Sequence, residues 1–156
     1  MSYYLAANLN SAMDDALAAT EAALQAEGFG VVTRIDMAAT LKAKIGADFR
    51  PYVILGACNP ALAYEALQLE DKVGTMLPCN VIVQSLAPDR TEVAAIDPVA
   101  SMQAIDNDRL KHAAKEVRAR LERVIGSLSA DPSTRGREAA DHDRVPDEED
   151  ASVASR

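Results

Sequence analysis

The sequence contains no tryptophan, and its other aromatic residues, four tyrosines and two phenylalanines, make up only 4% of 156 residues. Proteins that bind single-stranded nucleic acid by stacking bases need an aromatic surface, which this composition argues against. Positive charge is also scarce, because 16 Lys and Arg stand against 24 Asp and Glu, for a net charge of -8. Since nucleic-acid binding requires cations that replace the counterions of phosphate, we expect no nucleic-acid partner.

Long apolar runs and export features are absent as well. No run approaches the roughly 18 apolar residues of a membrane-spanning helix, so we expect no membrane partner. The first ten residues hold no Lys or Arg, and Asp14 and Asp15 precede any apolar stretch long enough for an export signal. Cysteine occurs only twice, at Cys58 and Cys79. Few cysteines without an export signal indicate a reducing compartment, and we predict a cytoplasmic protein.

The composition changes sharply after Leu128. Residues 129–156 contain no Leu, Ile, Met or aromatic residue and carry eight acids and four arginines, a net charge of -4. A segment with so little to bury cannot offset the entropy lost on ordering it. We therefore predict one folded domain, residues 1–128, followed by an acidic disordered tail that either solubilises the protein or recruits a basic partner.

The first 128 residues alternate between β-rich and helix-periodic segments. Strands are predicted at residues 3–9, 29–35, 52–57, 81–86 and 92–96. Helices are predicted to follow Ser11, Asp36, Asn59, Asp97 and Asp108.

Helix-start and helix-end signals set the expected boundaries. Ser11, with Asp14 three residues later as an acidic partner, is predicted to be the N-cap of the first helix. Asp36 and Asp108 are predicted to cap later helices. Gly28 and Gly46 stand where two helices should end. The last helix is defined best, because apolar residues recur every three or four positions at Leu110, Ala114, Val117, Leu121, Val124 and Leu128.

The element order β-α-β-(α)-β-(α)-β-β-α predicts an α+β domain, with helices packed on one face of a mostly antiparallel sheet. A doubly wound parallel sheet is the competing architecture, since strands and helices alternate between residues 29 and 86. The closing hairpin around Pro88 and Asp89, and the lack of a glycine-rich phosphate loop, favour the antiparallel sheet.

The two cysteines lie in similar short motifs. Cys58-Asn59-Pro60 ends a predicted strand and begins a helix, and Pro78-Cys79-Asn80 begins another strand. Unpaired N–H groups at a helix start favour a thiolate at Cys58. The two sulfur atoms could meet at one edge of the sheet if these strands are antiparallel, and would lie at opposite ends if they are parallel.

Four interpretations of this pair remain open. The first is two small buried residues, since free cysteine is often buried. The second is a redox-active dithiol, and the third is a metal or haem-iron site. The fourth is a nucleophile at Cys58, although no histidine base is evident. Zinc requires four ligands. With His142 in the tail and His112 off the apolar seam, a zinc site would need two cysteines from each subunit of a dimer.

Several segments, in order along the chain, resemble a known family. They are GF at Gly28–Phe29, LGACNPALAYEAL at Leu55–Leu67, VGTMLPCNVIV at Val73–Val83, and AIDP at Ala95–Pro98 followed by Met102. Over about residues 1–128 the chain is similar to the small bacterial and archaeal proteins of domain-of-unknown-function family 302. The resemblance implies a TATA-binding-protein-like α+β fold and a homodimer, and its antiparallel strands would bring Cys58 and Cys79 together.

Our hypothesis is a homodimeric module, more binding protein than enzyme, in which the CNP and PCN segments hold a small ligand, a metal or thiol chemistry. Cys58 would be the more reactive thiol and Cys79 the resolving or co-ligating one. Asn59 and Asn80 would fix the loops by hydrogen bonds, and Asp97 would be a nearby acid. The alternative is a structural or interaction protein whose cysteines only pack and whose tail recruits a partner. In that case the asparagines serve turns and Asp97 caps a helix.

Overall fold

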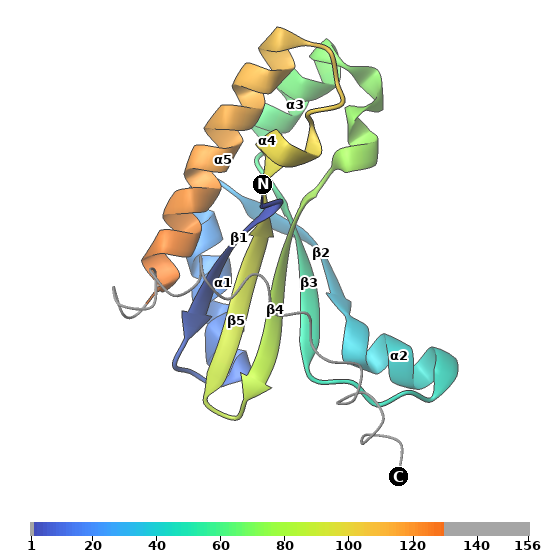
Figure 1. The fold of residues 1–156 in the computed structure, drawn as a ribbon, viewed down its shortest axis with the longest axis vertical. Helices are drawn as coiled ribbons and strands as arrows, with labels where there is room; N and C mark the ends of the chain where they lie inside the picture. The colour runs from blue at the N-terminus through green and yellow to red at the C-terminus, as the bar shows by residue number, and fades with distance from the viewer. Residues whose placement is uncertain (1, 130–156) are drawn as a thin grey trace.

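The computed structural model describes residues 2–129 (Figure 1). The predicted tail beyond residue 129 lies outside the described residues. Along the chain stand β1 (Tyr4–Leu9), α1 (Met13–Ala26), β2 (Gly30–Asp36), α2 (Met37–Ile45), β3 (Tyr52–Cys58), α3 (Pro60–Leu69), the 3-10 helix η1 (Asp71–Met76), β4 (Cys79–Ala87), β5 (Arg90–Ile96), α4 (Pro98–Ser101) and α5 (Asp108–Leu128).

The five strands form one sheet in the order β1-β5-β4-β3-β2, and every neighbouring pair is antiparallel. This confirms the predicted α+β class and excludes the doubly wound parallel sheet. The hairpin between β4 and β5 turns through Pro88 and Asp89, as their turn chemistry predicts.

One face of the sheet carries the main core. Side chains alternate between the two faces of a strand, and the buried apolar side chains of β3 (Val53, Leu55 and Ala57) alternate in this way. Cys79, Val81 and Val83 of β4 are buried beside them and belong to the same apolar cluster. In Figure 1, α1 and the lower half of α5 lie along the sheet, and both helices contribute buried residues to this cluster. Helices on one face were predicted, and the structure confirms them.

Helix α5 extends beyond the end of the sheet, and its first half packs against the helices that lie there (Figure 1). The predicted seam is confirmed, with all its residues buried except the partly buried Val117. Leu110 and Ala114 join Ala66, Val73 and Met102 in a second, smaller apolar cluster. Residues 2–129 therefore contain two apolar clusters, one on the sheet and one among α3, η1, α4 and α5.

At the edge of the sheet opposite β1, β2 pairs with β3 along its length and leads into α2. All seven residues of β2 are exposed, and α2 has no buried residue. Asp36 caps α2 by accepting a hydrogen bond from the Ala39 N–H, and Gly46 ends it at φ 67°. Both signals were predicted from the sequence, and the second uses a left-handed conformation that glycine adopts freely.

Two capping predictions are wrong. Helix α1 is preceded by Ala12, and no side chain caps it; the Ser11 backbone carbonyl accepts a hydrogen bond from the Thr91 hydroxyl of β5 (2.9 Å). Helix α5 is capped by Asn107, whose side chain accepts from the Leu110 N–H and donates to the Leu69 carbonyl, while Asp108 is the first helical residue. At α5 the cap residue is thus also held by a contact distant in sequence.

None of the helices in residues 2–129 is both long enough and apolar enough to cross a bilayer.

Candidate thiol site

Antiparallel pairing of β3 with β4 brings the two cysteine motifs together. The register places Ala57 directly opposite Cys79, so Cys58 lies one position beyond the residue that faces Cys79. This is the arrangement that the sequence required for a shared site. Each thiol is free rather than joined in a disulfide.

Both cysteines line one cavity of about 40 Å³. It lies between the two apolar clusters: Phe29, Ala57 and Cys79 of the sheet cluster form one side, and residues of α3, α4 and α5 form the other. Asn59, Pro78, Pro98 and Met102 are also among its lining residues. The remaining walls are apolar.

Cys58 is the more accessible thiol. It is half-buried, as the last residue of β3, immediately before the start of α3. Asn59 caps α3 by accepting a hydrogen bond from the Leu62 N–H (3.2 Å), and Pro60 occupies the first turn. Cys58 is therefore the thiol that a reagent or ligand from solvent reaches first.

Cys79 is the deeper thiol, with 7% of its surface exposed. Burial, followed by the charge of the nearby Cys58, raises the pKa of Cys79 to about 11. At neutral pH Cys79 is therefore a neutral thiol.

Gly56 is a site residue that sequence reasoning missed. A Cβ atom at this position would lie 2.7 Å from Cγ of Pro78 and would also collide with Thr33. Only a residue without a side chain lets the cavity-lining Pro78 sit against β3. A glycine inside an apolar strand run is the signal for such a close approach.

The remaining predicted residues lie outside the cavity. Asn80 is exposed on β4, and Asp97 is buried but does not line the cavity. Asp97 caps α4 by accepting hydrogen bonds from Val99 N–H (2.9 Å) and Ala100 N–H (3.4 Å), and it forms an ion pair with Arg118 Nε (3.0 Å). Asp97 therefore caps α4, and its ion pair with Arg118 connects the end of β5 to α5.

Within residues 2–129 no group of three or more His, Cys, Asp and Glu side chains is placed to hold a metal. His112 is exposed on α5 and belongs to a different surface hollow, and His142 lies outside the described residues. A single chain therefore offers no four-ligand zinc site in its described part.

The chain matches the model of the family described as "Domain of unknown function DUF302" over residues 6–128. It belongs to the DUF302 family. The resemblance noted in the sequence is thereby confirmed. No curated protein matches the chain. Among solved structures, an uncharacterised conserved DUF302 protein from Bacillus stearothermophilus superposes with a TM-score of 0.76 at 27% identity, covering 82% of this chain and 99% of that one.

Proposed function

We propose that this DUF302 domain is a cytoplasmic thiol module that binds a ligand of very few atoms between Cys58 and Cys79. The observation that carries the proposal is that these two cysteines, from separate segments, line one apolar cavity. The reducing compartment indicated by the composition keeps both thiols free to bind.

The size of the cavity limits the ligand. A pocket for a drug-sized molecule or an organic cofactor measures roughly 300 to 1,000 Å³, whereas a water molecule needs about 10 to 15 Å³. The volume here, about 40 Å³, suits an ion or a small inorganic species. This argues against the haem-iron version of the hypothesis.

The sheet register argues against a direct sulfur–sulfur bond. The residue directly across from Cys79 is Ala57, not Cys58, and consecutive residues of a strand alternate between its faces. A shared ligand is supported instead by the cavity that both cysteines line at the end of β3. In such a site Cys58 meets the ligand first and Cys79 completes its binding.

Selective alkylation of the native protein tests the assigned order of reactivity. We expect iodoacetamide at neutral pH to label Cys58 first and Cys79 only after unfolding, as read by mass spectrometry of the peptides. Cys79→Ala should leave the labelling of Cys58 largely intact, whereas Cys58→Ser should abolish native labelling. A native protein in which neither cysteine reacts, or in which Cys79 reacts first, would contradict the proposal.

A second candidate function is a scaffold whose cysteines only pack, and the membership of Cys79 in the main core favours it. Under this alternative, replacing both cysteines lowers the free energy of unfolding and changes no binding property. If the double cysteine variant shows the same ligand-dependent shifts in Tm as the unaltered protein, the protein is a scaffold.

We also propose that the protein is a homodimer formed through the uncovered face of the sheet. The register aligns an apolar row across all five strands: Ala6, Ala94, Ile82, Ile54 and Ile35, none of which is buried. The adjacent row is polar and balanced in charge, since Arg50 donates to Gln84 and Gln84 donates to Glu92. A second copy of this chain can cover such a face without bringing like charges together.

A further inference from the structure

A third sulfur atom belongs to the same cavity. Met102 follows α4 and is 6% exposed, and it lines the cavity together with Cys58 and Cys79. Three segments that are distant in sequence thus each contribute one sulfur-bearing residue: the end of β3, the start of β4 and the end of α4.

The other lining residues further restrict the kinds of ligand that the cavity can bind. Among the described residues around this cavity there is no carboxylate, imidazole, ammonium or guanidinium group, and Asn59 is the one polar side chain. Calcium and magnesium require several oxygen ligands, and structural zinc requires four donors. Thiolate and thioether sulfur in an apolar setting is the donor set that monovalent copper prefers.

We propose that the cavity binds one Cu(I) ion through the sulfur atoms of Cys58 and Cys79, with the Met102 thioether as a third donor. This assignment rests on the proposed function and names its ligand. The cavity volume of about 40 Å³ accommodates a single ion.

Binding is an exchange of protons for metal, without a change in oxidation state. Cu(I) displaces one proton from each thiol, two copper–sulfur bonds form, and two protons leave to solvent. The copper–dithiolate unit carries one negative charge, and the start of α3, a ten-residue helix next to Cys58, is placed to stabilise it. Half-buried Cys58 gives an incoming ion its first ligand. Cys79 and Met102, which are both buried, then complete its coordination.

The test is anaerobic titration of the full chain with Cu(I) against a coloured Cu(I) chelator. We expect one ion per chain. Losing a ligand should cost more than the roughly 10- to 100-fold effect of an outer-shell change, so Cys58→Ser and Cys79→Ser should each lose at least about 100-fold in affinity. Met102→Leu should lose about 10-fold and reduce the sulfur neighbours seen by X-ray absorption from three to two.

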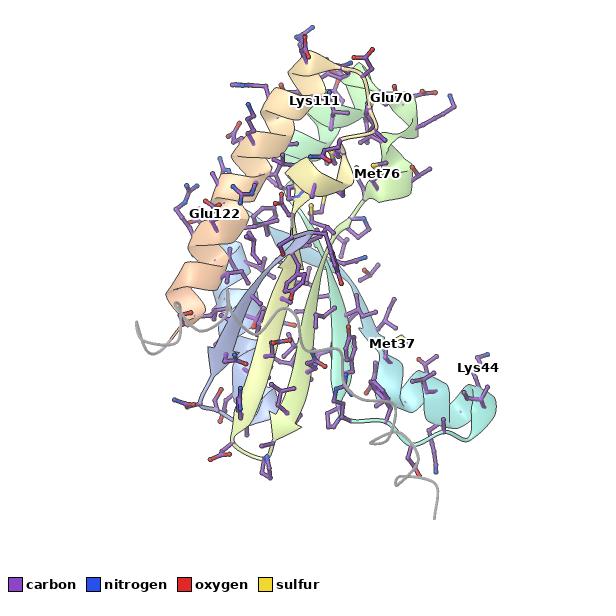
Figure 2. All side chains as sticks on the ribbon, in the orientation of Figure 1. Met37, Lys44, Glu70, Met76, Lys111 and Glu122 are labelled. Carbon is purple, nitrogen blue, oxygen red and sulfur yellow. The ribbon has the colours of Figure 1, made fainter. Side chains whose placement is uncertain are left out.

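A matched control comes from another methionine near the second apolar cluster. Met76, the last residue of η1, packs against that cluster but does not line the cavity, and Figure 2 shows it beside the ribbon of η1. Met76→Leu should bind Cu(I) as the unaltered protein does. Thermal unfolding of each variant shows whether it folds. Cys58→Ser is the variant expected to disturb folding least, because Cys58 is half-buried.

Three results would overturn the assignment. They are Cu(I) affinity no higher than that of the double cysteine variant, an equal effect of Met102→Leu and Met76→Leu, or preferential uptake of one Zn(II) per two chains. Native labelling of Cys58 is measured without copper. Failure of copper binding with intact selective labelling would therefore refute only the copper assignment, whereas failure of both would refute the thiol module.

Discussion

At the scale of single residues, Cys79 combines a titratable thiol with a core position. Burial and the neighbouring Cys58 raise the pKa of Cys79 from 9.0 to about 11. The folded state therefore keeps the proton that the unfolded chain loses above pH 9. Folding stability from this group is complete below pH 9 and is lost as the pH rises toward 11.

This difference predicts alkaline destabilisation that depends on Cys79. Between pH 9 and pH 11 the unaltered protein should lose about 2 kcal/mol more unfolding free energy than Cys79→Ala, measured by urea denaturation. Parallel pH profiles of the two proteins would show that Cys79 is not held protonated by the core.

Asp97 is a residue whose sequence pattern allowed two interpretations, an acid at the site or a helix cap. Its hydrogen bonds to α4 and its ion pair with Arg118 are those of the cap. Sequence alone predicted the cap from Asp97-Pro98, but Arg118 is 21 positions away, and only the packing of α5 on the sheet brings it close.

We expect Asp97→Ala to lower the unfolding free energy by about 1 to 2 kcal/mol, because it removes the cap and one of the ion pairs of Arg118, which keeps its pair with Glu122. Asp97→Asn keeps a cap oxygen and should lose less. Native alkylation of Cys58 should proceed at the same rate in both variants. A large change in that rate, with stability unaltered, would instead place Asp97 in the thiol chemistry.

At the scale of elements, local signals predicted most of the chain correctly. Asp36 and Gly46 bound α2, Pro60 begins α3, and the seam of α5 faces the core, since each depends on residues within one or two turns. The predicted starts of α1 and α5 were each one residue away from the observed N-cap, which is Ala12 for α1 and Asn107 for α5. The hydrogen bond from Asn107 to the Leu69 carbonyl joins residues 38 positions apart, so a local pattern could not show it.

The close approach of β3 to Pro78 gives a prediction at this scale. Gly56→Ala should lower the unfolding free energy by about 1 to 3 kcal/mol, because the new methyl group collides with Pro78 and Thr33. Since Pro78 lines the cavity, the variant should also change the alkylation rate of Cys58.

Gly126 in α5 is the matched control for Gly56, because a Cβ atom there meets nothing within 4 Å. Gly126→Ala should raise stability by about 0.5 to 1 kcal/mol and leave the alkylation rate of Cys58 unchanged. Equal thermal shifts in the two glycine variants would contradict the packing argument.

At the scale of the whole molecule, the sheet has one covered and one open face. If a second copy covers the open face, Ile82→Glu in the middle strand should convert a dimer to a monomer at micromolar concentration, as measured by light scattering. Tyr64→Glu, at a residue of α3 that is 67% exposed, is the control and should leave the dimer intact. A monomeric unaltered protein, or a dimer that survives Ile82→Glu, would exclude this interface.

The cavity itself could be predicted only in part. The sequence showed the two cysteine motifs, and it showed that they could meet only if their strands were antiparallel. Strands β3 and β4 are antiparallel neighbours, as this requires. Its other walls come from Phe29, α3, α4 and α5, which meet only when the two apolar clusters pack together. For that reason neither its small volume nor the presence of Met102 could be read from the sequence.

The most direct measurement of the shared site uses arsenite, whose As(III) centre forms bonds to two nearby thiols and releases two water molecules. Mass spectrometry of the native protein should find one arsenic per chain, with Cys58 and Cys79 both protected from alkylation after unfolding. Binding should vanish in Cys58→Ser and in Cys79→Ser. An unmodified chain, or arsenic that leaves either cysteine free to react, would contradict the claim that the two thiols share one site.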